Sequence, residues 1–122
     1  MTLKILLIDD DDGFRQVTAM ALEAEGCSVR EATNGLSALA CLELETPDLI
    51  ISDIEMPGID GVELSQLIRG NPAFARTPLM LLSAHVAPDG AGLDPNHKAD
   101  TCVSKEVEFR QLFRRILLLL NG

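Results

Sequence analysis

The 122-residue sequence predicts an α/β fold, a doubly wound parallel sheet of five strands with helices on both faces. Short aliphatic runs without polar alternation recur along the chain, as in strands that are covered on both faces. Segments with apolar residues at helical spacing separate these runs, which is the pattern of βαβ units with right-handed crossovers. The length is close to the commonest domain size, so we expect residues 1–122 to form a single domain.

The first half of the chain carries three strands and two helices of this pattern. Strands are expected at residues 4–8, 28–31 and 48–52, and the second lies nearer an edge of the sheet. The first helix is indicated by apolar positions at helical spacing and ends near Gly26; these positions are Phe14, Val17, Thr18, Ala21 and Leu22. Asn34-Gly35 predicts a turn before a second helix at residues 36–44.

The second half begins with a loop directly after Asp53. The stretch IEMPGIDG (54–61) is expected to be this loop because Pro57-Gly58 favours a turn. Asp60 can cap a third helix, whose apolar positions are Val62, Leu64, Leu67 and Ile68. The remaining elements are a strand at 78–82, a weak strand at 101–103 and a last helix at 107–120, with Phe109, Leu112, Phe113 and Ile116 on one face.

Residues 86–98, VAPDGAGLDPNHK, occupy the place of the fourth helix in this pattern. Their two prolines and two glycines oppose a regular helix, because proline lacks the N–H donor and glycine loses more backbone freedom on folding. We therefore expect this helix to be short, distorted or replaced by a loop.

The composition limits the classes of partner. A net charge of −9 argues against direct nucleic-acid binding, which needs clustered lysine and arginine, and suits a cation or a basic partner surface. Hydrophobic residues make up 47% of the chain, and because its aromatic residues are four phenylalanines the core must be mostly aliphatic. The apolar run at 116–120 is too short to span a bilayer, so we expect no membrane association.

Neither the cysteines nor the histidines have the spacing of a metal site. Cys27, Cys41 and Cys102 are not paired in sequence, and we expect them to be small buried residues in a reducing cytoplasm. His85 is interpreted as an exposed loop residue, and the alternative is that it borders the site described next.

Polar residues follow the predicted strands at the edge where doubly wound folds bind ligands. Asp9 and Asp10 follow the first strand, Asp53 the third, Ser83 the fourth and Lys105 the fifth. Three carboxylates, one hydroxyl and one ammonium should therefore converge. Clustered carboxylates repel one another, and a hard cation such as Mg²⁺, which prefers oxygen ligands, relieves that repulsion.

This set of groups is suited to phosphoryl chemistry. A carboxylate can attack phosphorus and hold an acyl phosphate, and the added negative charge then needs Mg²⁺, a lysine and a hydroxyl donor. Asp53 fits the nucleophile and Asp10 the metal ligand, while Lys105 and Ser83 fit the two donors.

The stretch LLIDDDD (6–12) places four carboxylates after the first strand. Asp11 and Asp12 lie at the expected helix start, where a carboxylate caps N–H groups and complements the helix dipole. We interpret these two as caps, and Asp9 and Asp10 as groups that serve a cation.

With these residues in place, the sequence resembles the receiver domain of two-component response regulators. The matching motifs are LLIDD (6–10), DLIISDIEMPGIDG (48–61), LLSA (81–84) and Lys105, in order and with that family's usual spacing. The resemblance covers essentially the whole chain. It implies a flavodoxin-like sheet with the strand order 2-1-3-4-5.

The resemblance implies an Mg²⁺ site and a phosphoacceptor. Asp53 is similar to the acceptor and would also bind the metal. Asp10 would be a direct ligand, Asp9 would act through water, and the backbone carbonyl of Glu55 would be a further ligand.

The resemblance also implies roles for the donors near the acceptor. Lys105 would pair with Asp53 and then with the phosphoryl group. Ser83 would bind a phosphoryl oxygen and move toward it on activation, in a switch region that includes Ala84 and Cys102.

A protein of this family would take its phosphoryl group from a histidine kinase or a histidine phosphotransfer protein. It would then switch its contacts with a downstream effector protein or domain, or form a homodimer. Its own chemistry would be limited to self-phosphorylation from phosphodonors and autodephosphorylation.

The sequence departs from the family pattern in the relay from site to surface. Glu106 stands where the family usually has proline after the site lysine, which leaves the turn there open. Cys102 stands where the family usually has tyrosine or phenylalanine, so the usual aromatic rotamer switch cannot operate as such.

Two other functions compete with the phosphorylated switch. The altered relay favours a protein-interaction module that keeps the fold and signals without phosphorylation. A Mg²⁺-dependent phosphohydrolase is the second alternative, because Glu55 stands two residues after the predicted nucleophile, where such enzymes usually have a second acid.

Overall fold

A computed structural model describes residues 2–85 and 94–121 of the chain. Five parallel strands form one sheet in the order β2-β1-β3-β4-β5, which confirms the predicted topology. The strands are β1 (Lys4–Ile8), β2 (Ser28–Ala32), β3 (Leu49–Asp53), β4 (Leu79–Ser83) and β5 (Thr101–Ser104). The third and fourth strands each lie one residue later than the sequence predicted, so Asp53 and Ser83 are the last residues of their strands.

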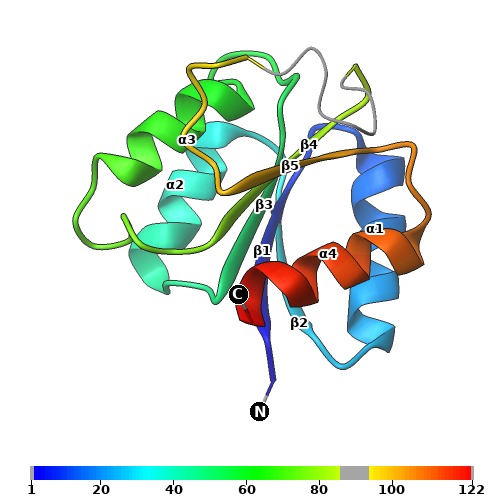
Figure 1. Cartoon of the computed structure of the whole chain (residues 1–122). Coiled ribbons are helices and arrows are strands. Elements are labelled where there is room, and N and C mark those ends of the chain that lie inside the picture. Colours follow the sequence, from blue (N-terminus) through cyan, green and yellow to red (C-terminus); the bar gives the residue numbers. More distant parts are fainter. Residues whose placement is uncertain (1, 86–93, 122) are drawn as a thin grey trace.

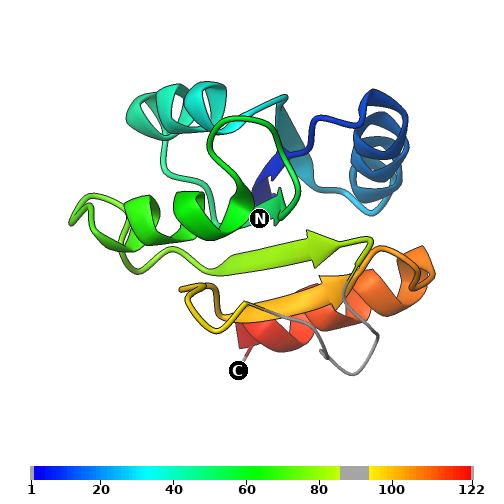
Figure 2. The same cartoon turned by 90° about the horizontal axis from the view of Figure 1, so that it is seen from above.

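Four helices are present among the described residues: α1 (Asp12–Ala24), α2 (Gly35–Leu44), α3 (Gly61–Arg69) and α4 (Phe109–Asn121). Figures 1 and 2 show α1 and α4 on one face of the sheet and α2 and α3 on the other. Within residues 2–85 and 94–121, every helix is too short or too polar to cross a bilayer.

The sheet separates two aliphatic cores, because alternate residues of a strand point to opposite faces. One core joins Ile5 and Leu7 of β1 to α1 and α4, and the other joins Leu6 and Ile8 to α2 and α3. Every residue of β3 and β4 is buried. Burying one such aliphatic side chain stabilises the fold by about 1.5–3 kcal/mol, so these two strands fix the centre of the molecule.

Side-chain caps begin the first three helices and fix the loops that follow the strands. Asp11, Asn34 and Asp60 each accept a hydrogen bond from the backbone N–H three residues further on. Two of these caps, Asp11 and Asp60, hold the loops that carry the predicted site residues. Both were predicted from the sequence as helix starts.

The prediction that Asp12 is also a cap is wrong. Asp12 is the first residue of α1, and its carboxylate contacts the guanidinium of Arg15 at 2.8 Å. Arg15 is nearly buried, which the helical spacing did not predict. Two apolar positions of the predicted helix faces are also exposed: Val17 on α1 is 68% exposed and Leu67 on α3 is 48% exposed.

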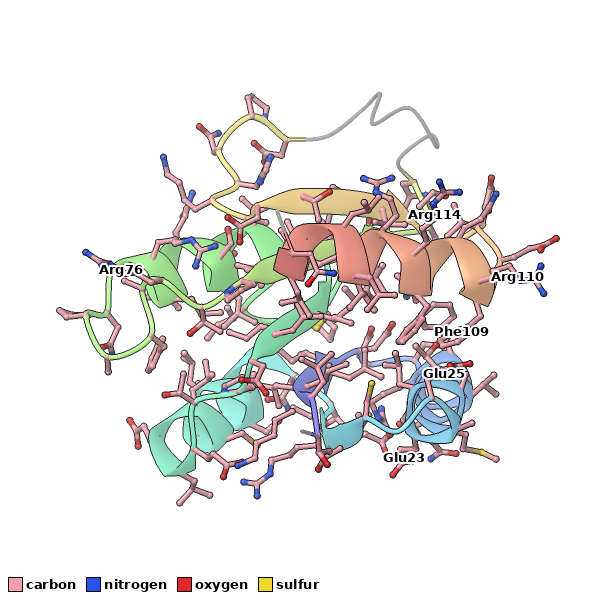
Figure 3. All side chains as sticks on the ribbon, turned by 60° about the horizontal axis from the view of Figure 1, so that its bottom comes forward. Glu23, Glu25, Arg76, Phe109, Arg110 and Arg114 are labelled. Atoms are coloured by element: carbon pink, nitrogen blue, oxygen red, sulfur yellow. The ribbon has the colours of Figure 1, made fainter. Side chains whose placement is uncertain are left out.

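The last helix begins at Phe109, two residues later than predicted. Figure 3 shows Phe109 pointing toward α1 from the start of α4, with Arg114 on the outer side of the helix. Leu112 and Ile116 are buried, as predicted. Residues 94–98 contain a turn and no helix, whereas residues 86–93, the main part of the predicted distorted helix, lie outside the described residues.

Gly61, at the start of α3, is packed directly behind the end of β3. Its N–H donates to the carbonyl of Ile54 at 2.8 Å. A Cβ atom at this position would overlap the backbone carbonyl of Asp53 and would lie 2.7 Å from Cα of Ile54. Glycine is therefore required here because the two backbones approach each other closely. The loop between them turns at Gly58, whose φ of +76° also favours glycine.

We expect Gly61→Ala to destabilise the protein by about 1–3 kcal/mol, because the backbone at Asp53 and Ile54 must shift to admit the methyl group. Urea unfolding measures the change. Gly13→Ala is the matched control, since a Cβ at Gly13 makes only an ordinary contact with Asp11 at 3.5 Å. Alanine inside α1 should stabilise the helix by about 0.5–1 kcal/mol. Equal stability of Gly61→Ala and the wild type would contradict the close packing.

Candidate functional site

Three carboxylates meet at the carboxyl edge of the sheet, as predicted. Asp9 and Asp10 follow β1, and Asp53 ends the neighbouring strand β3. Each residue offers one carboxylate oxygen, and these three oxygens all lie within 4.8 Å of one another. Asp9 and Asp53 are buried while Asp10 is exposed, so the cluster opens to solvent on the side of Asp10.

Lys105 bridges the two buried carboxylates. Its Nζ lies 2.8 Å from Asp9 Oδ2 and 3.3 Å from Asp53 Oδ1. Burial alone would lower the pKa of Lys105, but its close contact with Asp9 and the charge of Asp53 outweigh burial and raise it. The backbone of Lys105 is fixed as well, because its N–H donates to the carbonyl of Ser83 at 2.9 Å.

The surroundings of Asp53 disfavour its ionised form. Burial raises the pKa of Asp53 to about 7, and the nearby charge of Asp9 adds to this effect. The ammonium of Lys105 acts in the opposite direction and offsets only part of the shift. A single lysine is therefore not enough to balance the acids at this edge of the sheet.

The remaining imbalance fits a bound cation. Asp9 Oδ2 and Asp53 Oδ1 are buried oxygens that accept no well-aligned hydrogen bond from the described residues, and both face the ammonium of Lys105. Three carboxylates against one ammonium leave a local excess of negative charge. Carboxylate oxygens are the ligands that Mg²⁺ prefers, so the donor set suits this ion.

Ser83 is completely buried at the end of β4, next to β3. Its hydroxyl donates to Glu55 Oε1 at 2.6 Å and accepts from the N–H of His85 at 2.9 Å. The side chain of Glu55 thus reaches over the site. The single proton of the Ser83 hydroxyl is engaged by this carboxylate.

Cys102 lies on β5 opposite Leu81 and is half-buried, not fully buried as expected. Burial raises the pKa of the Cys102 thiol, and the charge of Glu55 raises it further. Cys41 is also half-buried, and only Cys27 is buried as predicted. Ala84 follows Ser83 in an exposed bend.

The turn after Lys105 forms without the proline that the family usually has there. The N–H of Glu106 donates to the side-chain oxygen of Ser104 at 3.1 Å. The N–H of Val107 donates to the backbone carbonyl of Ser104 at 3.3 Å. The described residues contain no cis peptide bond. A buried serine thus organises the turn that was left open by the sequence.

Arg15 is the site-supporting residue that sequence reasoning missed. Its guanidinium donates to the backbone carbonyl of Asp9 at 2.8 Å and to Glu31 at 2.9 Å, in addition to its contact with Asp12. Burial lowers the pKa of Arg15, but its hydrogen bonds to Asp12 and Glu31 outweigh burial and raise it. An arginine among apolar positions of the first helix, near the acidic run, was the available signal.

The fold and the site together define a class of protein. They describe a small doubly wound α/β protein whose acid cluster and lysine meet at the carboxyl edge of the sheet. The sequence model of the response regulator receiver domain family matches residues 5–117, and the chain belongs to this family. The protein is thus a receiver domain of the kind found in two-component response regulators.

Individual relatives agree with this assignment. The transcriptional regulatory protein CseB of Streptomyces coelicolor is 34% identical over 117 residues, which cover 96% of this chain and 49% of CseB. A putative response regulator from Chloroflexus aurantiacus has a TM-score of 0.90 at 28% identity, with both chains fully covered. The chemotaxis response regulator CheY4 of Vibrio cholerae has a TM-score of 0.88 at 26% identity, covering 98% of this chain and 99% of CheY4.

The chain spans about half the length of CseB, whose full length includes a further part. The part that the two proteins share is the receiver domain, so the similarity to CseB concerns this domain alone.

We expect the stability of the metal-free protein to fall as the pH rises from about 4 to about 7. In this window Asp53 binds a proton in the folded state but not in the unfolded state, where its pKa is near the ordinary 3.8. Asp53→Asn removes the penalty of ionisation, so the variant should be similar in stability to the wild type near pH 4, and its advantage should grow until the pH passes about 7.

Thermal unfolding in the presence of EDTA measures this difference. Glu43→Gln, which neutralises an exposed carboxylate on α2, shows the effect of removing one charge far from the site. A stability difference between Asp53→Asn and the wild type that stays constant from pH 5 to pH 8 would contradict the prediction.

The hydrogen bond between Ser83 and Glu55 should appear as a coupling energy of about 1–2 kcal/mol in a double-mutant cycle of Ser83→Ala and Glu55→Ala. Unfolding in urea gives the four stabilities. The same cycle with Glu63→Ala, an exposed acid on α3, is the control and should show no coupling. Additive effects of the Ser83 and Glu55 changes would mean that the bond is absent in solution.

Proposed function

We propose that Asp53 accepts a phosphoryl group from a phosphorylated histidine of a partner protein, and that this reaction switches the contacts of the domain. The observation that carries the proposal is the bridge from Lys105 to Asp9 and Asp53, which places a carboxylate, a second acid and an ammonium at one point. Asp53 lies at the end of a fully buried strand, so its side chain is held in place by the core.

The proposed step exchanges one bond to phosphorus for another. A carboxylate oxygen of Asp53 forms a bond to phosphorus, and the bond between phosphorus and the donor's imidazole nitrogen breaks. The electron pair of the broken bond stays on the imidazole. The product is an acyl phosphate on Asp53, which returns to the carboxylate when water later attacks the phosphorus.

The residues at the edge of the sheet fit an Mg²⁺ ion during this step. Asp10, Asp53 and the backbone carbonyl of Glu55 would hold it directly, and Asp9 through water. When bound, Mg²⁺ supplies positive charge that favours the ionised form of Asp53 and offsets the charge of the phosphoryl oxygens. The side chain of Asp9 is already held in place, because it accepts a hydrogen bond from the N–H of Asp11 at 2.9 Å and pairs with Lys105.

Lys105 and Ser83 would stabilise the phosphorylated form. Lys105 already pairs with an oxygen of Asp53 at 3.3 Å, so its ammonium can reach a phosphoryl oxygen on Asp53 without a large movement. Ser83 must first release Glu55, because its one proton is donated to that carboxylate. The negative charge of a phosphoryl group beside Glu55 would favour this exchange, since like charges repel. Ser83, Ala84 and Cys102 would then form the part of the structure that changes.

The partners follow from this chemistry. A histidine kinase or histidine phosphotransfer protein would supply the phosphoryl group, and a downstream effector protein or domain, or a second copy of the chain, would respond to it. We place the domain in the cytoplasm, where such donors act. The described residues offer no specific feature that favours signalling without phosphorylation. Glu55 hydrogen-bonds Ser83, so its carboxylate is not poised as the second acid of a phosphohydrolase.

We expect the protein to gain the mass of one phosphoryl group when it is incubated with acetyl phosphate and MgCl₂. Asp53→Asn should show no gain, because the amide is not a nucleophile, and EDTA should prevent the gain in the wild type. Mass spectrometry of the intact protein measures both results.

Asp11→Asn is the matched control for this experiment. It removes a carboxylate from the same loop, yet asparagine caps a helix as well as aspartate does, so phosphorylation should persist. Normal labelling of folded Asp53→Asn would contradict the assignment of the acceptor.

A further inference from the structure

Lys105 makes a third contact, with the aromatic ring of Phe14 in the first turn of α1. Its Nζ lies 4.6 Å from the centre of the ring, within the range of a cation–π interaction. We propose that Phe14 is a positioning residue for the reaction at Asp53, because its ring holds the ammonium of Lys105 where it reaches Asp9 and Asp53 together. This inference rests on the proposed function and assigns a role to a residue outside the motifs of the sequence.

The ring of Phe14 is itself fixed. The N–H of Phe14 donates to the side chain of Asp11 at 3.1 Å, which ties the residue to the loop after β1. Its side chain is partly buried against the core that β1 shares with α1 and α4. The cap thus fixes the backbone of Phe14, and the contacts with the core limit where its ring can lie.

The ammonium of Lys105 has three N–H donors, and the structure offers three groups around it. Two are the carboxylates of Asp9 and Asp53, and the third is the face of the Phe14 ring. They come from the loop after β1, from β3 and from α1. The four-carbon side chain of lysine is flexible. Its ammonium is therefore positioned by the groups around it, which here are the two carboxylates and the ring of Phe14. The contact is also largely withdrawn from water, since the Lys105 side chain is only 14% exposed.

An aromatic ring is suited to this position because it attracts a cation without carrying a charge. An acid at position 14 would compete with Asp53 for Lys105 and would neutralise it before a phosphoryl group arrives. The acids of the same turn are engaged elsewhere: Asp11 caps the helix and Asp12 contacts Arg15. The first turn of α1 thus presents an uncharged surface to Lys105, and the full positive charge remains available to the site.

Phe14→Leu tests this role by removing the ring and keeping an apolar side chain. We expect labelling by acetyl phosphate with MgCl₂ to be about threefold to tenfold slower than in the wild type, from the strength of a partly desolvated cation–π contact. Phe14→Tyr keeps an aromatic face and should restore most of the rate. Phe113→Leu, which removes another partly buried ring from the same core, is the control for packing and should leave the rate near that of the wild type.

A double-mutant cycle separates positioning from a general loss of stability. If Phe14 acts through Lys105, Phe14→Leu should slow labelling in the wild type but have little further effect in Lys105→Ala. Equal effects in the two backgrounds would overturn the proposal. The position of Lys105 can also be read without any reaction, because a ring below the ammonium moves the NMR signals of the Lys105 Cε protons upfield.

The upfield shift should be present in the wild type and in Phe14→Tyr, and absent in Phe14→Leu. Absence of the shift in the wild type would overturn the positioning role alone. The same holds if Phe14→Leu loses the shift but is still labelled at the rate of the wild type. A wild-type protein with the shift but with no uptake of a phosphoryl group would instead overturn the proposed function, and with it the reaction that Phe14 is proposed to serve.

Discussion

The bridge from Lys105 to Asp9 and Asp53 is the interaction on which the rest of the site depends. Two buried carboxylates at the ends of neighbouring strands repel each other, and burial makes that repulsion stronger because water is excluded. The strand order brings β1 and β3 together, so the fold cannot avoid this repulsion. An ammonium supplied from the turn after β5 compensates part of it. The part that is not compensated keeps Asp53 hard to ionise and makes the site receptive to a second cation.

Other groups around the cluster can be understood from the same charge balance. Arg15 is buried and donates to the backbone carbonyl of Asp9, so a second cation besides Lys105 contacts the loop that carries the cluster. Glu55 adds a further negative charge at the outer side, where it is held by the hydroxyl of Ser83. Asp9, Asp53 and Arg15 are buried, whereas Asp10 and Glu55 are exposed, so the acidic cluster extends from the interior to the surface.

Most of the fold and the principal site residues could be predicted from the sequence, and the errors have physical causes. Strands buried on both faces give continuous aliphatic runs, so β1, β3 and β4 were placed within one residue. The strand-end rule brought Asp9, Asp53 and Lys105 together. Helix periodicity does not reveal which polar residue is buried, and so Arg15 was missed, as was the partner of Asp12. The contacts of Phe14 and Glu55 with the site depend on side-chain directions between distant segments, which spacing along the chain does not encode.

The bridge also has a consequence for the order in which the chain folds. Asp9 and Lys105 are 96 residues apart (105 − 9), so the pair closes one of the longest loops in the domain. Contacts of such long range form late, because their loop entropy must be overcome first. A partly folded chain that has assembled β1 and β3 but has not yet docked β5 must hold two buried acids without their lysine. The repulsion between the two acids raises the free energy of such an intermediate at neutral pH. Folding of the sheet therefore becomes more cooperative. The repulsion between Asp9 and Asp53 thus disfavours a half-built sheet that lacks Lys105.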